Sequence, residues 1–186
     1  MSNFSALLDA CVIFPFSLCN ILLEAAYQEL YQVHFSTTIL DEAIRNRVKR
    51  GRMNQAVAEK FKAAMIRSFP NALVEAPANL EGKMENHPGD RHVLASAVYA
   101  KVDVIVTSNL KHFSASSLAP WGMEVMHPDE FLNYLCDENG DETLYDLVQG
   151  MIASYNKPPI TYLEFFSKFE MEQPKFCRRM LNFACR

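Results

Sequence analysis

Three acidic residues in three different settings constrain this chain most. Asp9 directly follows the apolar run at residues 5–8, Glu42 lies in a segment with helical spacing, and Asp90 opens another such segment. A carboxylate at a strand end and two near helix starts can converge in one cleft of a parallel sheet. Carboxylate oxygens are the ligands that Mg²⁺ prefers in proteins. The three residues are therefore candidate metal ligands.

Length and composition favour one domain with a sizeable core, with room for an appendage. The chain has 186 residues, of which 49% are hydrophobic, so disorder is not expected. Its five cysteines include no Cys-x-x-Cys pair, which argues against a disulfide framework or a zinc site and favours a reducing cytoplasm. The longest uncharged run, residues 10–23, is too short to span a bilayer. We expect a cytoplasmic protein with no signal peptide and no membrane partner.

Hydrophobic periodicity predicts alternating strands and helices over the first part of the chain. Strands are expected at 5–8, 33–36, 71–74, 103–107 and 123–126, and helices at about 16–31, from Ser36–Thr38 onward, at 54–68 and at 91–101. Repeated β-then-α units of this size predict a parallel, doubly wound sheet. After about residue 135 only helices are expected, with a linker at 137–141 and helices starting near Pro158-Pro159 and after Pro174.

Charge is distributed unevenly, although the net charge is only −4. A basic segment follows Glu42 in the sequence and is a candidate for contact with RNA phosphates: Arg45, Arg47, Lys49, Arg50 and Arg52. The alternative is a solvated helix face that ends at Gly51. Among the charged side chains of residues 124–172, acidic ones outnumber basic ones.

Four segments together carry a resemblance to a known family. They are Leu8-Asp9-Ala10-Cys11-Val12, Asp41-Glu42, Asp90-Arg91-His92-Val93-Leu94-Ala95, and Ile105 to Phe113 with Asn109 inside it. In this order and spacing they resemble the PIN-domain ribonucleases, especially the VapC-type toxins of prokaryotic toxin–antitoxin pairs. The likeness covers roughly residues 5–135, and the helical tail more loosely resembles the extension of some PIN toxins.

The resemblance implies a three-layer α/β/α PIN-like domain with a central parallel sheet at residues 1–135 and an all-helical C-terminal extension at 136–186. It implies a metal-dependent endoribonuclease toxin that hydrolyses structured RNA such as tRNA. Asp9, Glu42 and Asp90 would hold Mg²⁺ or Mn²⁺, while Asn109 and His112 would shape the second side of the site. The implied partners are RNA, a cognate antitoxin and a second copy of the chain in a homodimer.

Two positions depart from the family pattern. His112 stands where family members usually carry an aspartate, and His87 stands where relatives often carry an acid. Because like charges about 4 Å apart repel by roughly 4 kcal/mol at an effective dielectric of 20, three carboxylates need a cation between them. With His112 in place of the fourth acid, a second metal position should lose charge and affinity, although imidazole can still bind manganese.

These departures leave other functions open. One is a degenerate PIN module that binds RNA or a protein without cleaving, and another is a nuclease acting on DNA or in ribosomal-RNA processing. Simpler structural roles are also open for single residues. Asp90 could be a helix N-cap, Glu42 a first-turn carboxylate or a partner of Arg45, and His92 a buried hydrogen-bonded histidine.

Overall fold

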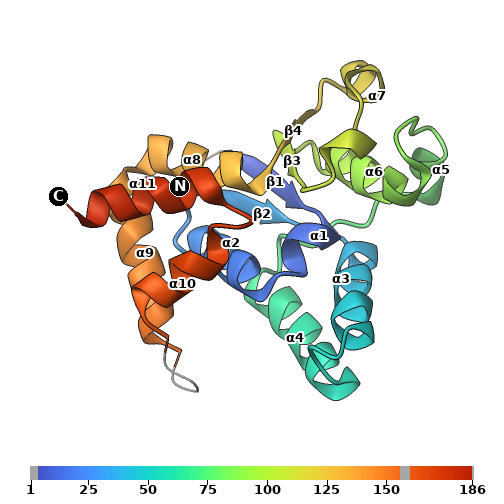
Figure 1. Cartoon of the computed structure of the whole chain (residues 1–186). Helices are drawn as coiled ribbons and strands as arrows, with labels where there is room; N and C mark the ends of the chain where they lie inside the picture. Colours follow the sequence, from blue (N-terminus) through green and yellow to red (C-terminus); the bar gives the residue numbers. More distant parts are fainter. Residues whose placement is uncertain (1–3, 156–159, 186) are drawn as a thin grey trace.

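The computed structural model of the protein describes residues 4–155 and 160–185. Four strands form a fully parallel sheet: β1 (Ser5–Leu8), β2 (Gln32–His34), β3 (Val104–Val106) and β4 (Glu124–Met126). Their order across the sheet is β2-β1-β3-β4 (Figure 1). In this register Leu7 lies opposite His34 on one side and Ile105 on the other. The central strands β1 and β3 are wholly buried, as sheets covered on both faces require.

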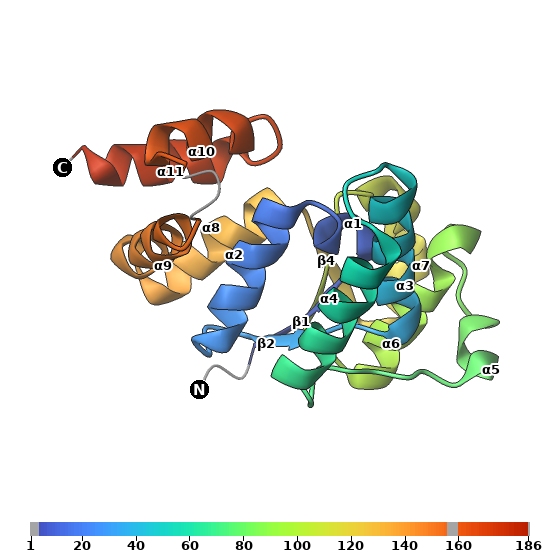
Figure 2. The same ribbon diagram turned by 90° about the horizontal axis from the view of Figure 1, so that it is seen from below.

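Helices cover both faces of the sheet. Figure 2 shows α2, α8 and α9 on one side and α3, α4 and α6 on the other. The bounds are α1 Ala10–Ile13, α2 Phe16–Tyr27, α3 Thr37–Lys49, α4 Gln55–Ser68, α5 Ala78–Glu81, α6 Arg91–Ala100, α7 Ala115–Leu118, α8 Pro128–Asn139, α9 Asp141–Ala153, α10 Tyr162–Phe169 and α11 Pro174–Ala184. Short 3-10 turns lie at Pro88–Asp90, Leu110–His112 and Ala119–Trp121. The expected three-layer α/β/α fold with a parallel sheet is confirmed.

Polar side chains cap the starts of two helices. The Ser36 side chain accepts a hydrogen bond from the Ile39 N–H at 3.2 Å and caps α3. Asn54 caps α4 in the same way through the Val57 N–H at 2.9 Å. The Ser36 cap fixes where α3, the helix that carries Glu42, begins, and the Asn54 cap does the same for α4.

The prediction of a strand at 71–74 is wrong. This segment makes only an isolated parallel bridge between Leu73 and Phe35, beyond the end of β2. Its β-branched content is low, and Pro70 precedes it. The following segment at 76–90 contains α5 and a 3-10 turn.

The linker predicted at 137–141 is corrected by the structure. Residues 137–139 are the last turn of α8, and Gly140, at φ 90°, is the short break before α9 begins at Asp141. The helix α9 packs on α2, so the tail shares the core of the sheet domain. The predicted start at Pro158-Pro159 lies outside the described residues, and α10 begins after Thr161, whose side chain and Glu164 form a capping box. A domain boundary at 135/136 stays a prediction.

The last helix is tied to α8 by polar contacts. Asp129, which is 4% exposed, accepts from the Lys175 and Phe176 N–H groups at 3.1 and 2.9 Å and so caps the start of α11. Arg179 pairs with Asp137 and Asp141 at 2.6 and 2.5 Å. No helix in the described ranges is long and apolar enough to cross a membrane.

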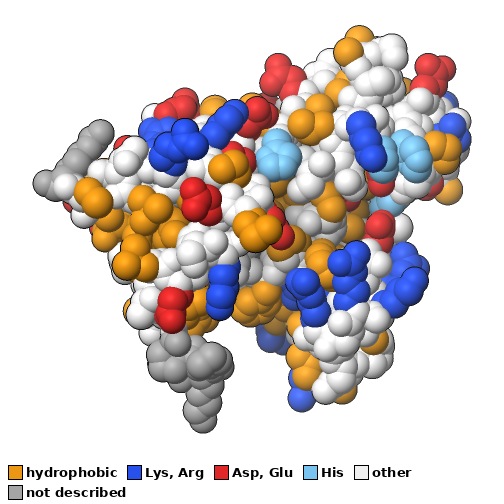
Figure 3. All heavy atoms as spheres, in the orientation of Figure 1, with side chains coloured by type: hydrophobic (Ala, Val, Ile, Leu, Met, Phe, Trp, Pro, Cys, Tyr) orange, Lys and Arg blue, Asp and Glu red, His pale blue; other side chains and the backbone are white. Residues whose placement is uncertain are grey.

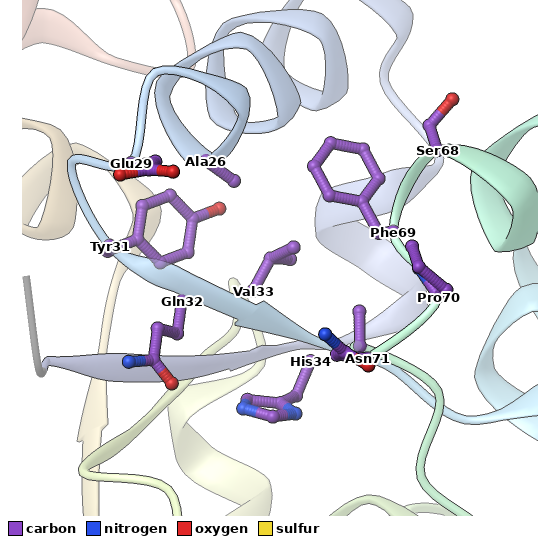
Figure 4. A pocket seen from close by; sticks show the side chains of 11 residues that line it. Ala26, Glu29, Tyr31, Gln32, Val33, His34, Ser68, Phe69, Pro70 and Asn71 are labelled. Carbon is purple, nitrogen blue, oxygen red and sulfur yellow. The ribbon is translucent and has the colours of Figure 1, made fainter. Parts of the chain in front are cut away.

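A hollow of about 420 Å³ opens beside the edge strand β2 (Figure 4). Tyr31, Val33 and His34 line it from the strand side, and Phe69 and Pro70 line it from the segment after α4. None of the carboxylates predicted as metal ligands is among its lining residues. The candidate site therefore lies elsewhere in the fold.

Candidate metal and nucleic-acid site

The sheet has its topological switch point between β1 and β3, because the chain leaves these neighbouring strands toward opposite sides. Asp9 follows β1 directly, and its N–H donates to the Val106 carbonyl of β3 at 3.1 Å. Thr107 follows β3. The first predicted ligand thus lies at the carboxyl ends of the two central strands, where open α/β sheets place their sites.

Two side chains orient the Asp9 carboxylate, which is 3% exposed. The Thr107 hydroxyl donates to Asp9 Oδ2 at 2.6 Å, and the Cys11 thiol donates to the same oxygen at 3.2 Å. Burial, together with the charge of Asp9, raises the pKa of Cys11 to about 12, so its thiol stays protonated and remains a donor. Cys11 is not among the predicted site residues, although its position two residues after Asp9 is a signal in the sequence.

Glu42 lies in the electrostatic field of both other carboxylates. Desolvation and then the negative charge of Asp9 raise the pKa of Glu42, His92 opposes them, and the charge of Asp90 adds a smaller increase than the decrease due to His92. Glu42 is not in the first turn of α3, so the helix-dipole interpretation is wrong. Arg45 contributes the smallest of the effects on this pKa. Asp9, Glu42 and Asp90, called here the carboxylate cluster, therefore lie near enough for the charges of Asp9 and Asp90 to affect the pKa of Glu42.

His92 faces this cluster from α6. Its Nε2 lies 3.6 Å from Glu42 Oε2 and is buried without a hydrogen-bond partner among the described residues. The expectation of a fully hydrogen-bonded core histidine is therefore wrong for this nitrogen.

Asp90 lies at the N-cap position of α6, but its side chain makes no capping hydrogen bond. Asp90 Oδ2 instead lies 2.5 Å from His112 Nδ1 and 3.9 Å from His87 Nδ1. The N-cap role is thus contradicted. Its backbone is fixed from the other side, since the buried Asn86 amide donates to the Asp90 carbonyl at 3.0 Å.

The loop after β3 carries the other two predicted site residues. The Asn109 N–H donates to Thr107 Oγ1 at 3.0 Å, and the His112 N–H donates to the Asn109 carbonyl at 2.8 Å. These bonds bend the loop into its 3-10 turn, and that turn brings His112 to Asp90. The same loop therefore serves Asp9 through Thr107 and Asp90 through His112.

Four of the five predicted phosphate-binding side chains are exposed: Arg45, Lys49, Arg50 and Arg52. Arg47 is not, at 2% exposure, because its guanidinium donates to the Ile13 and Phe14 carbonyls at 2.6 and 3.0 Å and lies over the Phe61 ring. Its role is to satisfy the end of α1. Figure 3 shows Lys and Arg side chains gathered over α3, beside histidine and acidic side chains near α6.

The donor set suits a hard divalent cation. The carboxylates of Asp9, after β1, and Asp90, before α6, raise the pKa of Glu42 on α3, and a cation among the three would relieve this repulsion. The residues present therefore fit the metal that the resemblance implies.

Fold and site together define a parallel α/β protein with an acidic centre at its switch point. The chain is 38% identical, over 116 residues, to a protein of Mycobacterium tuberculosis strain H37Rv named "Putative ribonuclease VapC50"; the match covers 60% of this chain and 68% of that protein. No protein-family model matches the chain, and no solved structure matches it. The similarity to the Mycobacterium tuberculosis protein shows that the chain belongs to the VapC family.

Proposed function

We propose that this protein is a metal-dependent endoribonuclease that hydrolyses RNA phosphodiester bonds. The observation that carries the proposal is the carboxylate cluster at the switch point, in a chain related to a protein named as a ribonuclease. An RNA phosphate would be repelled by the negative charges of Asp9, Glu42 and Asp90 unless a cation stood between the phosphate and the carboxylates.

Asp9, Glu42 and Asp90 would hold Mg²⁺ or Mn²⁺. When bound, the ion supplies Lewis-acid stabilisation of phosphate oxygens and a water of lowered pKa. The carboxylate of Asp9 is pre-oriented for this role by the Thr107 hydroxyl and the Cys11 thiol. Hydrogen bonds of this kind to ligating side chains fix their orientation and raise affinity. Asn109 and His112 complete the side of the site that lies over β3.

The exposed basic set (Arg45, Lys49, Arg50 and Arg52) would bind RNA phosphates beside the acidic centre. Glu42 and Arg45 lie on the same helix, so a backbone phosphate held by the set lies next to the carboxylates. Binding of this type releases counterions and weakens as salt rises.

The biological role proposed is that of a toxin acting on structured RNA such as tRNA, held in check by a cognate antitoxin that covers the cleft. We also propose a cytoplasmic homodimer, with a nuclease domain at 1–135 and a helical extension at 136–186. Family membership supports the toxin role and the antitoxin partner among these proposals.

The test is cleavage of total RNA, including tRNA, by purified protein. We expect defined fragments with Mg²⁺ or Mn²⁺, no fragments with chelator, and recovery when metal is added back in excess. A folded protein that leaves RNA intact with every metal would contradict the proposal.

A second candidate function is a PIN module that binds RNA or a protein without cleaving. The contact of His112 with Asp90 at 2.5 Å favours it, because an imidazole occupies the place where the family carries a fourth acid. Retention of RNA on the protein with no cleavage, unaltered by chelator, would support this candidate.

A further inference from the structure

His87, Asp90 and His112 form a compact cluster that shares Asp90 with the carboxylate cluster, and we call it the His–Asp cluster. One ligand atom of each residue can be chosen so that all three lie within 4.8 Å of one another. We infer that this cluster binds a divalent transition-metal ion that prefers imidazole nitrogen, of the class of Zn²⁺, over Mg²⁺.

The backbone brings the two histidines together from separate loops. The His87 N–H donates to the His112 carbonyl at 3.1 Å, so the loop before α6 is joined to the loop after β3. The two rings consequently stack, with centroids 4.1 Å apart and planes at 14°. This contact holds two imidazoles beside one carboxylate, and because an imidazole nitrogen binds metal in the plane of its ring, one of the stacked rings must rotate for both to bind the same ion.

Each ring has a fixed position relative to Asp90. His87 Nδ1 accepts the Gly89 N–H at 3.2 Å, so its one lone pair is engaged there, and an ion bound at this nitrogen would displace the Gly89 N–H. A side chain at Gly89 would place its Cβ 3.3 Å from the same nitrogen, so the glycine allows this close approach. His112 Nδ1 meets Asp90 Oδ2 at 2.5 Å, and a metal ion would replace the proton now shared there.

The donor set decides which metals are preferred. Two imidazoles and one carboxylate are the ligands of catalytic zinc sites, which keep a further position for water. Mg²⁺ instead demands oxygen ligands and retains its waters. Imidazole favours the later divalent transition metals over Mg²⁺ and Mn²⁺. With a side chain that is 52% exposed, His87 leaves the cluster open to ions from solvent.

The test is calorimetric titration of the metal-free, full-length protein with Zn²⁺ alone and with Mg²⁺ alone, without RNA. We expect H87A and H112A each to weaken Zn²⁺ binding by about 10-fold or more. H112D should weaken Zn²⁺ binding and strengthen Mg²⁺ binding, because it restores an all-oxygen partner for Asp90.

His127 supplies a matched control. Like His87, it precedes a proline at a helix start and accepts a backbone N–H two residues later, here from Asp129 at 3.2 Å. H127A should leave Zn²⁺ affinity unchanged, which separates lost ligation from a lost cap. Circular dichroism of each variant checks that the fold is kept.

The inference is overturned if the wild type does not bind Zn²⁺, or if H87A and H127A bind it equally well. The first result would leave Asp90 and His112 as a hydrogen-bonded pair without metal, and the second would exclude His87 as a ligand. Since the titration contains no RNA, absence of RNA cleavage would leave the metal result intact, and loss of Zn²⁺ binding would leave the nuclease test intact.

Discussion

Thr107 and Asp9 lie 98 residues apart in the chain, yet the Thr107 hydroxyl donates to Asp9 Oδ2 at 2.6 Å. The two residues follow neighbouring parallel strands, so the sheet register itself brings them together. The same hydroxyl oxygen accepts the Asn109 N–H at 3.0 Å, so the proton of Thr107 is directed at the carboxylate. Thr107 is therefore a positioning residue for the first proposed metal ligand.

Replacing Thr107 by valine should lower the rate of metal-dependent RNA cleavage by about 10-fold, because an unsupported ligand binds metal less well. Serine at the same position should restore most of the rate, since it returns the hydroxyl. Initial rates at several Mg²⁺ concentrations measure both effects. A valine variant with the wild-type rate and metal dependence would show that the hydrogen bond is only structural.

Glu42 gives a prediction about pH. Burial, followed by the charges of Asp9 and Asp90, raises its pKa above the ordinary value of 4.5, so the folded state binds this proton more tightly than the unfolded chain does. That contribution to stability is present at low pH and is lost as pH rises through the raised pKa. Glu42→Gln should consequently raise the Tm of the metal-free protein at about pH 8 and change it little at about pH 4.

Thermal unfolding in the presence of chelator measures this difference. Saturating Mg²⁺ should reverse its sign at high pH, because the wild type gains a ligand charge that the glutamine variant lacks. A glutamine variant that is less stable than the wild type at every pH would contradict the effect of burial, Asp9 and Asp90 on the pKa of Glu42.

Arg47 and Arg45 should behave oppositely, although they lie two residues apart. Arg47→Ala removes the donors to the Ile13 and Phe14 carbonyls and should lower the free energy of unfolding by about 2–4 kcal/mol. The exposed Arg45 should change it by no more than about 0.5 kcal/mol when replaced by alanine. Chemical denaturation of both variants measures the contrast, and equal stabilities would contradict the buried position of Arg47.

Arg45→Ala should instead weaken RNA binding and reduce the slope of log affinity against log salt by about 1. Affinity measured at several salt concentrations with catalytically inactive protein checks this value. An unchanged slope would remove Arg45 from the proposed phosphate contacts.

Asp129 should be required for docking of the last helix. Asp129→Ala leaves the Lys175 and Phe176 N–H groups without their acceptor and should lower the free energy of unfolding by about 1–2 kcal/mol. The neighbouring Glu130 is a matched control, because it makes only an exposed contact with the Lys175 ammonium at 3.6 Å. Equal effects of the two alanine substitutions, measured by denaturation, would contradict the cap.

Much of the fold could be predicted because its signals are local. The apolar run before Asp9, the Ser36 cap and the β-branched residues at 104–106 each act within a few residues and fix β1, α3 and β3. Once the sheet is parallel, its carboxyl edge gathers Asp9 and Thr107 without further information. The segment at 71–74 and the linker at 137–141 could not be predicted, since tertiary packing decides both.

At the site, contacts between residues far apart in the sequence limit what can be predicted from the sequence alone. Helical spacing alone does not distinguish Arg45 from Arg47, because the carbonyls that bury Arg47 belong to α1. The stack of His87 on His112 likewise depends on one backbone hydrogen bond between two loops. Both histidines are departures from the family pattern, and His112 is also a predicted site residue, but no local sequence signal shows that the two meet.

The most direct test of the proposed nuclease centre compares Asp9→Asn with Asp103→Asn in the RNA cleavage assay. Asp103 precedes β3 at the opposite end of the sheet, where it accepts from the Ser5 N–H and hydroxyl at 2.7 Å each, so it controls for the loss of a hydrogen-bonded carboxylate beside a strand. We predict that Asp9→Asn lowers metal-dependent cleavage by roughly 100-fold or more while Asp103→Asn keeps it. Cleavage by Asp9→Asn at the wild-type rate would contradict the account.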